Sequence, residues 1–239
     1  IENQTLLAIT EFRERLKIVS AERIRDEFNK LILGEFPRNG LKILVDTKLA
    51  EQFIPEIPLL KLEIDEHHHH KDVYEHTLTV LEQAITLEKR LGNQDLVLRL
   101  AALFHDVGKR NVPLEILCKK GPLSDEEWTQ MRLHPTYGLK ILNEHAGISD
   151  AIKAACYEHH ESWSGGGYPQ DLSGHEIHPF GRLVSLTDTY DAMTTQRSYN
   201  SPMKPSQALQ MMKDKLSGRY DPEMLNAMYS VLFKIKKEA

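Results

Sequence analysis

The sequence predicts an all-α protein, a helical bundle that carries an N-terminal helical extension. Apolar residues recur at helical spacing along most of the chain, as in Val73, Val80, Ala84, Leu87 and Leu91. No run of alternating apolar and polar residues is long enough to require a sheet. These patterns indicate helices that each bury one face against their neighbours.

Start and stop signals divide the pattern into elements. Ser20 is an expected N-cap, Gly34 is an expected helix end, and Ser124 followed by Glu127 is expected to form a capping box. Segment 50–66 is expected to be a connector, and segment 161–178, rich in Gly, Ser and Pro, an ordered loop. Helices are expected over 5–18, 21–33, 72–91, 95–106, 125–134, 136–146, 149–160, 179–195, 205–216 and 221–236, with a short helix opening at Asn39-Gly40.

Composition places the chain among ordinary globular proteins. It has 239 residues and a formal net charge of -5, which argues against broad nucleic-acid binding because that needs a basic surface. The only cysteines, Cys118 and Cys156, do not make a disulfide framework, so a cytoplasmic location is expected. No apolar run reaches the roughly 18 residues of a membrane span, so no membrane partner is expected. Two domains are expected, over 1–66 and 67–239.

The strongest functional signal is His105-Asp106 at the end of the apolar helix expected over 95–106. Adjacent ionisable residues there are costly unless they are paired or bind a metal. Other ligand-type residues follow or precede at intervals of 25 to 29 residues, and each falls on a different expected helix. They are His76, His134, His159 with His160, and Asp188. Helices of a bundle can direct such side chains to one point in the core.

Each of these residues also has a structural interpretation. A lone histidine on an apolar helix is commonly a hydrogen-bonded core residue, and Asp188 alone is compatible with an N-cap or a salt bridge. The joint pattern favours metal binding, because imidazole with carboxylate suits Fe, Mn, Zn, Co or Ni. An aspartate can bridge two metals, and two metals about 3.5–4 Å apart activate water and polarise phosphoryl oxygens.

A series of short motifs follows in order along the chain: His105-Asp106-Val107-Gly108-Lys109, Pro113-Leu114-Glu115-Ile116-Leu117, His134-Pro135, His159-His160-Glu161, Gly167-Tyr168-Pro169, Asp188-Thr189-Tyr190-Asp191-Ala192 and Arg197-Ser198-Tyr199. These motifs resemble those of the HD-GYP family, a branch of the HD superfamily of metal-dependent phosphohydrolases, and the match covers roughly 72–239. The resemblance implies an HD-domain helical bundle over 67–239 that hydrolyses cyclic di-GMP.

The resemblance also implies roles for individual residues. The implied metal ligands are His76, His105, Asp106, His134, His159, His160 and Asp188, with Asp106 as the bridge. Two or three divalent transition metals are implied, with Fe or Mn favoured. Asp72 lies one turn before His76 and is either a ligand to a third metal or a first-turn acid. Lys109 would contact the substrate phosphate or the metal-bound hydroxide. Gly167, Tyr168 and Pro169 would line the substrate pocket, and Arg197 would bind a phosphate.

The chain departs from this family at two positions and resembles a second family elsewhere. Ser164 stands where the family often has Asp, and Asn200 where it often has Lys or Arg, which removes an expected phosphate contact. Residues 18–109 look like the HD-bearing C-terminal region of bacterial CCA-adding tRNA nucleotidyltransferases. The catalytic head of those enzymes is absent, so residues 1–66 are interpreted as a helical scaffold, from either a natural fusion or two joined sources.

Three functions remain open from the sequence. The leading expectation is a catalytic one: Asp106 and Lys109 support metal-dependent hydrolysis of cyclic di-GMP, or a related cyclic dinucleotide, to linear pGpG or GMP. The second is a sensor or docking module that binds the nucleotide without turnover. The third is an HD phosphodiesterase acting on 2′,3′-cyclic phosphates or tRNA ends. A homodimer is compatible with the sequence, which does not determine the oligomeric state.

Overall fold

A computed structural model describes residues 1–61, 73–91, 94–119, 121–195 and 201–234. Within these ranges the secondary structure is helical throughout and contains no strand, which confirms the all-α expectation. The α-helices are α1 (Asn3–Phe12), α2 (Ala21–Leu33), α3 (Pro37–Asp46), α4 (Val73–Leu91), α5 (Leu96–Phe104), α6 (Leu114–Leu117), α7 (Asp125–Met131), α8 (His134–Asn143), α9 (Asp150–Glu158), α10 (Pro179–Thr194), α11 (Pro205–Lys215) and α12 (Pro222–Lys234). The 3-10 helices are η1 (Arg13–Ile18), η2 (Ala50–Gln52), η3 (Pro58–Leu60), η4 (Val107–Asn111), η5 (Gly174–Glu176) and η6 (Ser217–Arg219).

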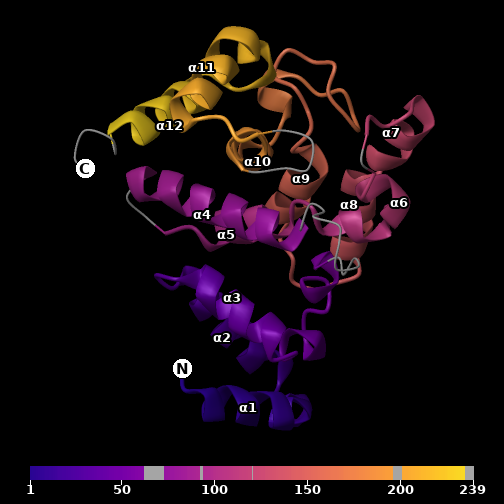
Figure 1. The fold of residues 1–239 in the computed structure, drawn as a ribbon, viewed down its shortest axis with the longest axis vertical. Helices are drawn as coiled ribbons and strands as arrows, with labels where there is room; N and C mark the ends of the chain where they lie inside the picture. Colours follow the sequence, from indigo (N-terminus) through magenta and orange to yellow (C-terminus); the bar gives the residue numbers. More distant parts are fainter. Residues whose placement is uncertain (62–72, 92–93, 120, 196–200, 235–239) are drawn as a thin grey trace.

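The first 60 residues form the narrow end of the molecule, and α4 and α5 separate them from the remaining helices (Figure 1). α2 begins and ends where expected, because the Ser20 side chain accepts a hydrogen bond from the Arg23 amide and Gly34 lies at the C-cap. The short helix expected to open at Asn39-Gly40 instead begins at Pro37, a residue favoured in the first turn of a helix. A glycine at position 40 allows Leu31 of α2 to approach α3 closely, because a Cβ at this position would lie 2.8 Å from the Leu31 side chain.

The helices α4, α5, α9 and α10 pack together at the centre of the molecule. Their apolar faces form the main core, whose completely buried members include Leu78, Val80, Leu81, Ala102 and Leu103. A second apolar cluster joins α10 to α11 and α12, at the end opposite the N-terminus in Figure 1. The centre of the bundle is therefore enclosed on several sides by separate helices, which is the arrangement expected for a core metal site.

Several boundaries differ from the sequence-based expectations, and one difference matters for function. The helix expected over 125–134 ends at Met131, although the Ser124–Glu127 capping box is present. The next helix begins at His134, two residues earlier than expected, with Pro135 in its first turn. The helix is therefore interrupted between Met131 and His134. This interruption places the His134 side chain at a helix start, facing the core. Asp72, Arg197, Asn200 and the run His67–His70 lie outside the described residues.

None of the helices combines a bilayer-crossing length with sufficient apolar character, within the ranges that the structure describes.

Candidate metal centre

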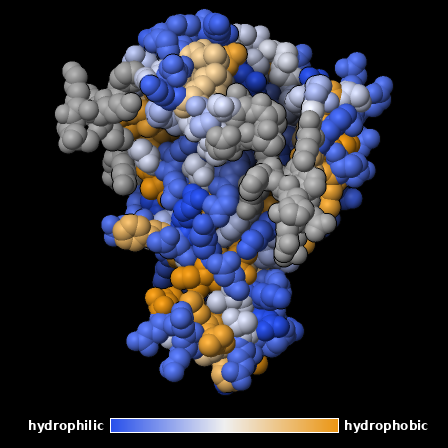
Figure 2. Space-filling view, viewed as in Figure 1, coloured by the Kyte–Doolittle hydropathy of each residue, from blue (hydrophilic) through white to orange (hydrophobic). Residues whose placement is uncertain are grey.

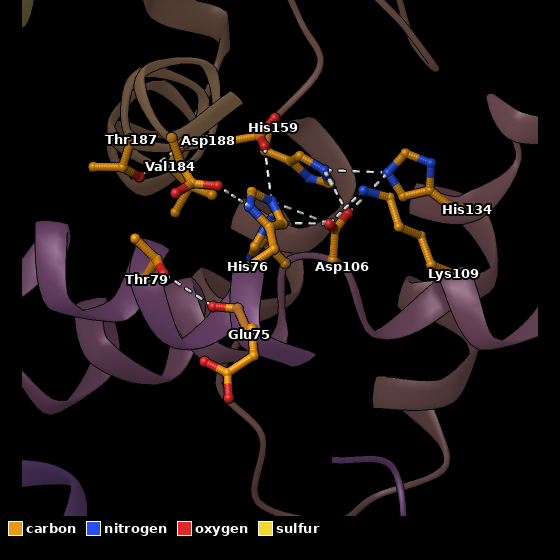
Figure 3. Close-up of polar contacts among 12 residues, drawn as sticks. Glu75, His76, Thr79, Asp106, Lys109, His134, His159, Val184, Thr187 and Asp188 are labelled. Atoms are coloured by element: carbon orange, nitrogen blue, oxygen red, sulfur yellow. Dashed lines mark hydrogen bonds and ion pairs between the residues drawn. The ribbon is translucent and has the colours of Figure 1, made fainter. Parts of the chain in front are cut away.

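Five helical elements direct ionisable side chains to one point in the core (Figure 3). His76 lies on α4, Asp188 lies on α10, and His134 starts α8. His105 and Asp106 directly follow α5, while His159 and His160 directly follow α9. His105, His134, His159 and Asp106 each expose at most 1% of their surface. The structure thus brings together all seven of the described residues that the sequence nominated as metal ligands.

Asp106 lies at the centre of this group. Its Oδ2 atom is 3.5 Å from His76 Nε2 and 3.4 Å from His105 Nε2. Its Oδ1 atom is 3.4 Å from His134 Nε2 and 3.7 Å from His159 Nε2. The two carboxylate oxygens therefore face two different sets of histidines, which is the geometry that a bridging carboxylate requires.

The remaining ligand-type residues separate into two groups of three. One group contains His76, His105 and Asp188, and the other contains His134, His159 and His160. Within each group the donor atoms lie within 4.8 Å of one another. In the first group, His76 Nε2 and Asp188 Oδ1 are 3.0 Å apart. With Asp106 between the groups, the side chains offer two adjacent sites that share one carboxylate.

Backbone carbonyl groups hold three of the histidines in one orientation. The Nδ1 atoms of His105, His134 and His159 each lie 2.8 Å from the carbonyl oxygen three residues earlier, in Ala102, Met131 and Cys156 respectively. A hydrogen bond from Nδ1 leaves Nε2 as the unprotonated atom that can bind a metal. All three Nε2 atoms accordingly face Asp106.

Asp191 performs the same task for His76. Its carboxylate is hydrogen-bonded to His76 Nδ1, and it is 1% exposed. Asp191 lies three residues after Asp188 on α10, so the two carboxylates contact opposite nitrogens of one imidazole. A carboxylate behind a histidine fixes the ring and increases its basicity toward a metal. The sequence analysis included Asp191 in a motif but assigned it no role.

The ionisation states of the centre suit metal binding. Burial lowers the pKa of His134 to about 3, lowers that of His159, and lowers that of His160 well below its usual range. Burial opposes ionisation of Asp106, yet the charges of Lys109 and His105 hold the pKa of this carboxyl well below its ordinary value. Neutral imidazoles and ionised carboxylates are the forms that bind metals.

The polar atoms of the centre lack enough protein partners. His105 Nε2, Asp106 Oδ1 and His160 Nδ1 are buried, and no described group forms a hydrogen bond with them. Buried polar atoms are nearly always satisfied, so three such atoms in one place indicate a bound group. Divalent metals fit this donor set, because each group of three supplies imidazole nitrogens and Asp106 supplies an oxygen to both.

Lys109 and Tyr168 border the centre. The Lys109 ammonium forms an ion pair with Asp106 Oδ2 (Figure 3). The Tyr168 ring stacks on His160, with centroids 4.8 Å apart and an interplanar angle of 22°. The Tyr168 amide also donates to the His160 carbonyl at 3.2 Å. The peptide bond between Tyr168 and Pro169 is cis. This loop therefore lies directly against the candidate ligands.

A comparison with family models identifies the larger part of the chain. Residues 58–224 match the family described as HD domain. The chain belongs to the HD domain family. Residues 1–60 are similar to a second family, described as the probable RNA- and SrmB-binding site of polymerase A, which fits the predicted likeness to CCA-adding enzymes.

Relatives of the HD domain include named phosphodiesterases. The chain is 31% identical over 235 residues to a cyclic di-GMP phosphodiesterase of Thermotoga maritima, covering 94% of this chain and 62% of that protein. It is 34% identical over 157 residues to the cyclic di-GMP phosphodiesterase PA4108 of Pseudomonas aeruginosa, covering 64% of this chain and 38% of that protein. A 3′3′-cGAMP-specific phosphodiesterase 2 of Vibrio cholerae is 33% identical over 133 residues, covering 55% of this chain and 26% of that protein. The chain thus spans about a quarter to three fifths of these relatives' lengths.

Solved structures confirm the fold. Bd1817, an HD-GYP-type protein from Bdellovibrio bacteriovorus, superposes with a TM-score of 0.55 at 20% identity, covering 89% of this chain and 67% of that chain. The HD domain of the L. monocytogenes phosphodiesterase PgpH, in complex with cyclic di-AMP, superposes with a TM-score of 0.51 at 18% identity, covering 69% of this chain and 90% of that chain. The predicted HD-GYP resemblance is confirmed by these findings together.

Within the HD domain, the sequence analysis missed residues that support the loop after α9. Glu161 is 2% exposed, and its two carboxylate oxygens accept hydrogen bonds from the amides of Gln170 and Leu172 at 2.6 and 2.9 Å. Gly167 was nominated to line the substrate pocket. Its hydrogens face the backbone of Glu161 and Ser162, where a Cβ would approach within 2.5 Å, so close chain crossing explains this glycine.

Proposed function

We propose that this chain is a metal-dependent phosphodiesterase that cleaves a cyclic dinucleotide, with cyclic di-GMP as its substrate and pGpG or GMP as the product. The observation that carries the proposal is the position of Asp106 between two groups of three ligand-type residues. Three further facts support it: the HD domain match, the curated names of the relatives, and the HD-GYP motif order. His76, His105, Asp106, His134, His159, His160 and Asp188 are proposed as the metal ligands.

Two bound metals would supply Lewis acidity and an activated water for attack on phosphorus. The chain's own residues would position the phosphodiester beside them. Lys109 Nζ, paired with Asp106 in the absence of substrate, would donate to a phosphoryl oxygen and stabilise its developing negative charge. The Tyr168 ring would exclude water from the face of His160 that it covers.

We propose iron or manganese as the resident metal. The two groups of ligand-type residues contain imidazoles and carboxylates but no thiol. Cys156 is buried nearby, but its Sγ lies 3.4 Å from the His105 carbonyl oxygen and is not a member of either group. Thiolate ligands favour zinc or iron–sulfur clusters, whereas mixed imidazole and carboxylate sites suit iron and manganese. Redox-active iron would also be detectable by its spectrum.

A second function is favoured by the match of residues 1–60 to an RNA-binding family segment. In that case the HD domain would hydrolyse 2′,3′-cyclic phosphates or the ends of tRNA. The HD-GYP loop around Tyr168 favours the cyclic dinucleotide, because its motif belongs to the family of the dinucleotide enzymes.

The test combines metal analysis with a substrate panel. Protein purified without chelators should contain about two equivalents of iron or manganese by plasma mass spectrometry. The metal-loaded protein would then be incubated with cyclic di-GMP, cyclic di-AMP, 3′3′-cGAMP, a 2′,3′-cyclic mononucleotide and tRNA. Hydrolysis of a cyclic dinucleotide supports the proposal, and hydrolysis of the RNA substrates alone supports the second function. Tight dinucleotide binding without turnover by fully loaded protein would make the chain a sensor.

A further inference from the structure

A cavity open to solvent lies against one face of α7, and Arg132, one of the residues that line it, contacts the Tyr168 ring. It has a volume of about 300 Å³ and is lined by Asp125, Trp128, Thr129 and Arg132. All four residues belong to α7 or directly follow it. Small-molecule sites commonly begin at about this volume, so the cavity can hold a group the size of a nucleobase. None of the four residues has a part in the candidate metal centre.

Ring contacts connect this cavity to the centre. The Arg132 guanidinium lies over the Tyr168 ring, 5.5 Å from its centroid, and the same ring stacks on His160. Arg132 also occupies the C-cap of α7, two residues before the candidate ligand His134. Arg132 therefore joins the cavity to the aromatic ring that covers His160.

The lining side chains are free to contact a ligand. Trp128 is 46% exposed, although indole rings are usually packed into a core. Neither the Asp125 carboxylate nor the Arg132 guanidinium forms an ion pair in the part of the chain that the structure describes. Helix capping does not use Asp125 either, because Glu127 closes the capping box with Ser124. Three different chemical groups, one aromatic, one anionic and one cationic, therefore border one empty space.

This combination matches one nucleobase better than the others. An exposed indole stacks on any base. A carboxylate accepts two hydrogen bonds from the N1–H and N2–H donors of guanine, whereas the corresponding edge of adenine presents an acceptor at N1. Arg132 would bind the phosphate between the guanine and the metals, since a guanidinium recognises phosphate oxygens in a bidentate manner.

We propose that the α7 cavity is a guanine subsite and that Asp125 gives the enzyme its preference for guanine over adenine. The inference rests on the proposed function, because it assumes that the substrate is a cyclic dinucleotide. It adds a specificity determinant that lies outside the metal centre and outside the loop around Tyr168. The ligand is thus held at two points, by its phosphate at the metals and by a base on α7.

The test measures binding to the full, metal-loaded chain with phosphorothioate analogues of cyclic di-GMP and cyclic di-AMP, which resist hydrolysis. Trp128→Ala should raise the Kd for the cyclic di-GMP analogue by roughly 5- to 100-fold, the usual effect of removing a base-stacking side chain. Trp128→Phe should restore most of the affinity. Leu114→Ala, which removes another half-exposed apolar side chain on the neighbouring α6, is the matched control and should leave Kd unchanged.

Asp125→Asn tests the specificity. It should reduce the ratio of the two Kd values, cyclic di-AMP over cyclic di-GMP, by about tenfold, because a bidentate contact contributes on the order of 1–3 kcal/mol to base discrimination. Quenching of Trp128 fluorescence by the guanine analogue gives an independent readout of stacking in a Trp163→Phe background.

The outcomes separate this inference from the proposed function. If the wild-type chain binds and hydrolyses no cyclic dinucleotide, the proposed function fails and the subsite fails with it. If it binds cyclic di-GMP but Trp128→Ala has the same Kd as Leu114→Ala, the function stands and the subsite is overturned. If Asp125→Asn leaves the ratio of the two Kd values unchanged, Asp125 does not determine base specificity. The Trp128 variants would still decide whether a base stacks on α7.

Discussion

The first helices of the N-terminal region and the centre of the HD domain bury their side chains to very different extents. Within the N-terminal region, α1 and η1 bury no residue at all, and α2 buries only Ile32. Hydrophobic residues gather on this narrow end (Figure 2), including Leu7, Phe12 and Ile18, which are all more than half exposed. The HD domain instead encloses a group of histidines and carboxylates that are almost completely buried.

The difference shows that the two regions depend on different interactions. The centre of the HD domain gains stability only if its buried polar atoms are satisfied, which a metal would accomplish. The N-terminal region is attached to the domain through a shared apolar core, to which Ile32, Leu41 and Leu60 contribute. Charged groups add to this attachment: Arg38 forms ion pairs with Glu75 and Glu82 on α4, and Arg99 on α5 donates to the Ile32 carbonyl of α2. We therefore expect substitutions in the two regions to separate activity from stability.

The largest expected effect is on activity and lies in the HD domain. Asp106→Ala should reduce turnover of cyclic di-GMP by at least about a thousandfold, since it removes a carboxylate whose two oxygens face both histidine groups. The apolar α5 should still pack, so circular dichroism should remain close to that of the wild type. Metal content and turnover would be measured on the same sample. Near-normal turnover by freshly loaded protein would contradict the bridging role.

The next effect is on stability and lies where the two regions meet. Arg99 is 3% exposed, pairs with the buried Glu88, and donates to the Ile32 carbonyl at 2.8 Å and the Gly34 carbonyl at 3.1 Å. Removing one partner of a buried pair leaves a buried charge and typically costs about 3–5 kcal/mol. Arg99→Met should lower the free energy of unfolding by about that amount in urea titrations. A loss below about 1 kcal/mol would show that Arg99 contributes little to stability or to attachment.

The matched control for Arg99 is Arg25→Met on α2. Arg25 is exposed and its only described contact is an ion pair with Asp26 at 3.4 Å. Surface pairs of this type contribute between zero and about 1 kcal/mol. Both variants lose one positive charge, but only Arg99 is buried, so the difference between them measures the effect of burial. Arg99→Met should therefore have the lower unfolding midpoint at any salt concentration.

The third expected effect is a dependence of stability on pH in metal-free protein. His134, His159 and His160 have lowered pKa values when folded, so the unfolded chain binds more protons as the pH falls below about 6.5. Asp106 and Asp188, with pKa values held well below normal, act in the same direction at lower pH. His76 opposes them, because its folded pKa is raised.

The sum predicts that metal-free protein loses stability steadily from about pH 7 toward pH 3. Thermal midpoints measured after chelation would show the decline, and bound metal should raise the midpoint most strongly near neutral pH, where the histidines are deprotonated in both states. His134→Gln should flatten the curve, since it removes a group whose pKa falls to about 3 on folding. A midpoint that rises on acidification would contradict the assignment of neutral histidines.

Local signals were enough to predict most of the helices and the residues of the centre. Ser20 and Ser124 mark helix starts by their own side chains, so their caps are visible in sequence. His105-Asp106 stands out because ionisable residues end an apolar helix. Pro37 was missed as a helix start because Asn39-Gly40 has the composition of a turn. The close approach of Leu31 to Gly40, which accounts for a glycine inside this helix, is visible only in the folded chain.

Residues that orient or contact the residues of the centre were harder to predict from the sequence. Asp191 acts through its contact with His76, 115 positions away in the sequence, and no local pattern marks that pairing. Arg132 has no local signal either, since its position over Tyr168 depends on how α7 packs beside the loop after α9. The sequence therefore predicts the groups that carry the chemistry, whereas the groups that orient them become visible only in three dimensions.

The smallest expected effect concerns a contact that joins the N-terminal region to the catalytic turn. Glu56, which precedes η3, is 8% exposed, and its Oε1 atom lies 3.3 Å from Arg110 Nη1 and 3.4 Å from His145 Nε2. Arg110 directly follows Lys109 on η4, so Glu56 restrains the turn that presents the Lys109 ammonium. Through this contact the N-terminal region reaches the side of the centre where Lys109 pairs with Asp106.

Glu56→Gln keeps the shape of the side chain and removes its charge. It should lower the free energy of unfolding by about 1 kcal/mol, since hydrogen bonds to charged groups contribute on the order of 1.5–3 kcal/mol and an amide retains part of that. Turnover should fall two- to threefold through kcat, at unchanged metal content, because Lys109 is less firmly held. Glu51→Gln, an exposed neighbour on η2, is the matched control and should change neither quantity. If Glu56→Gln loses stability but keeps its kcat, the contact attaches the two regions without positioning Lys109, and the catalytic turn is rigid without the N-terminal region.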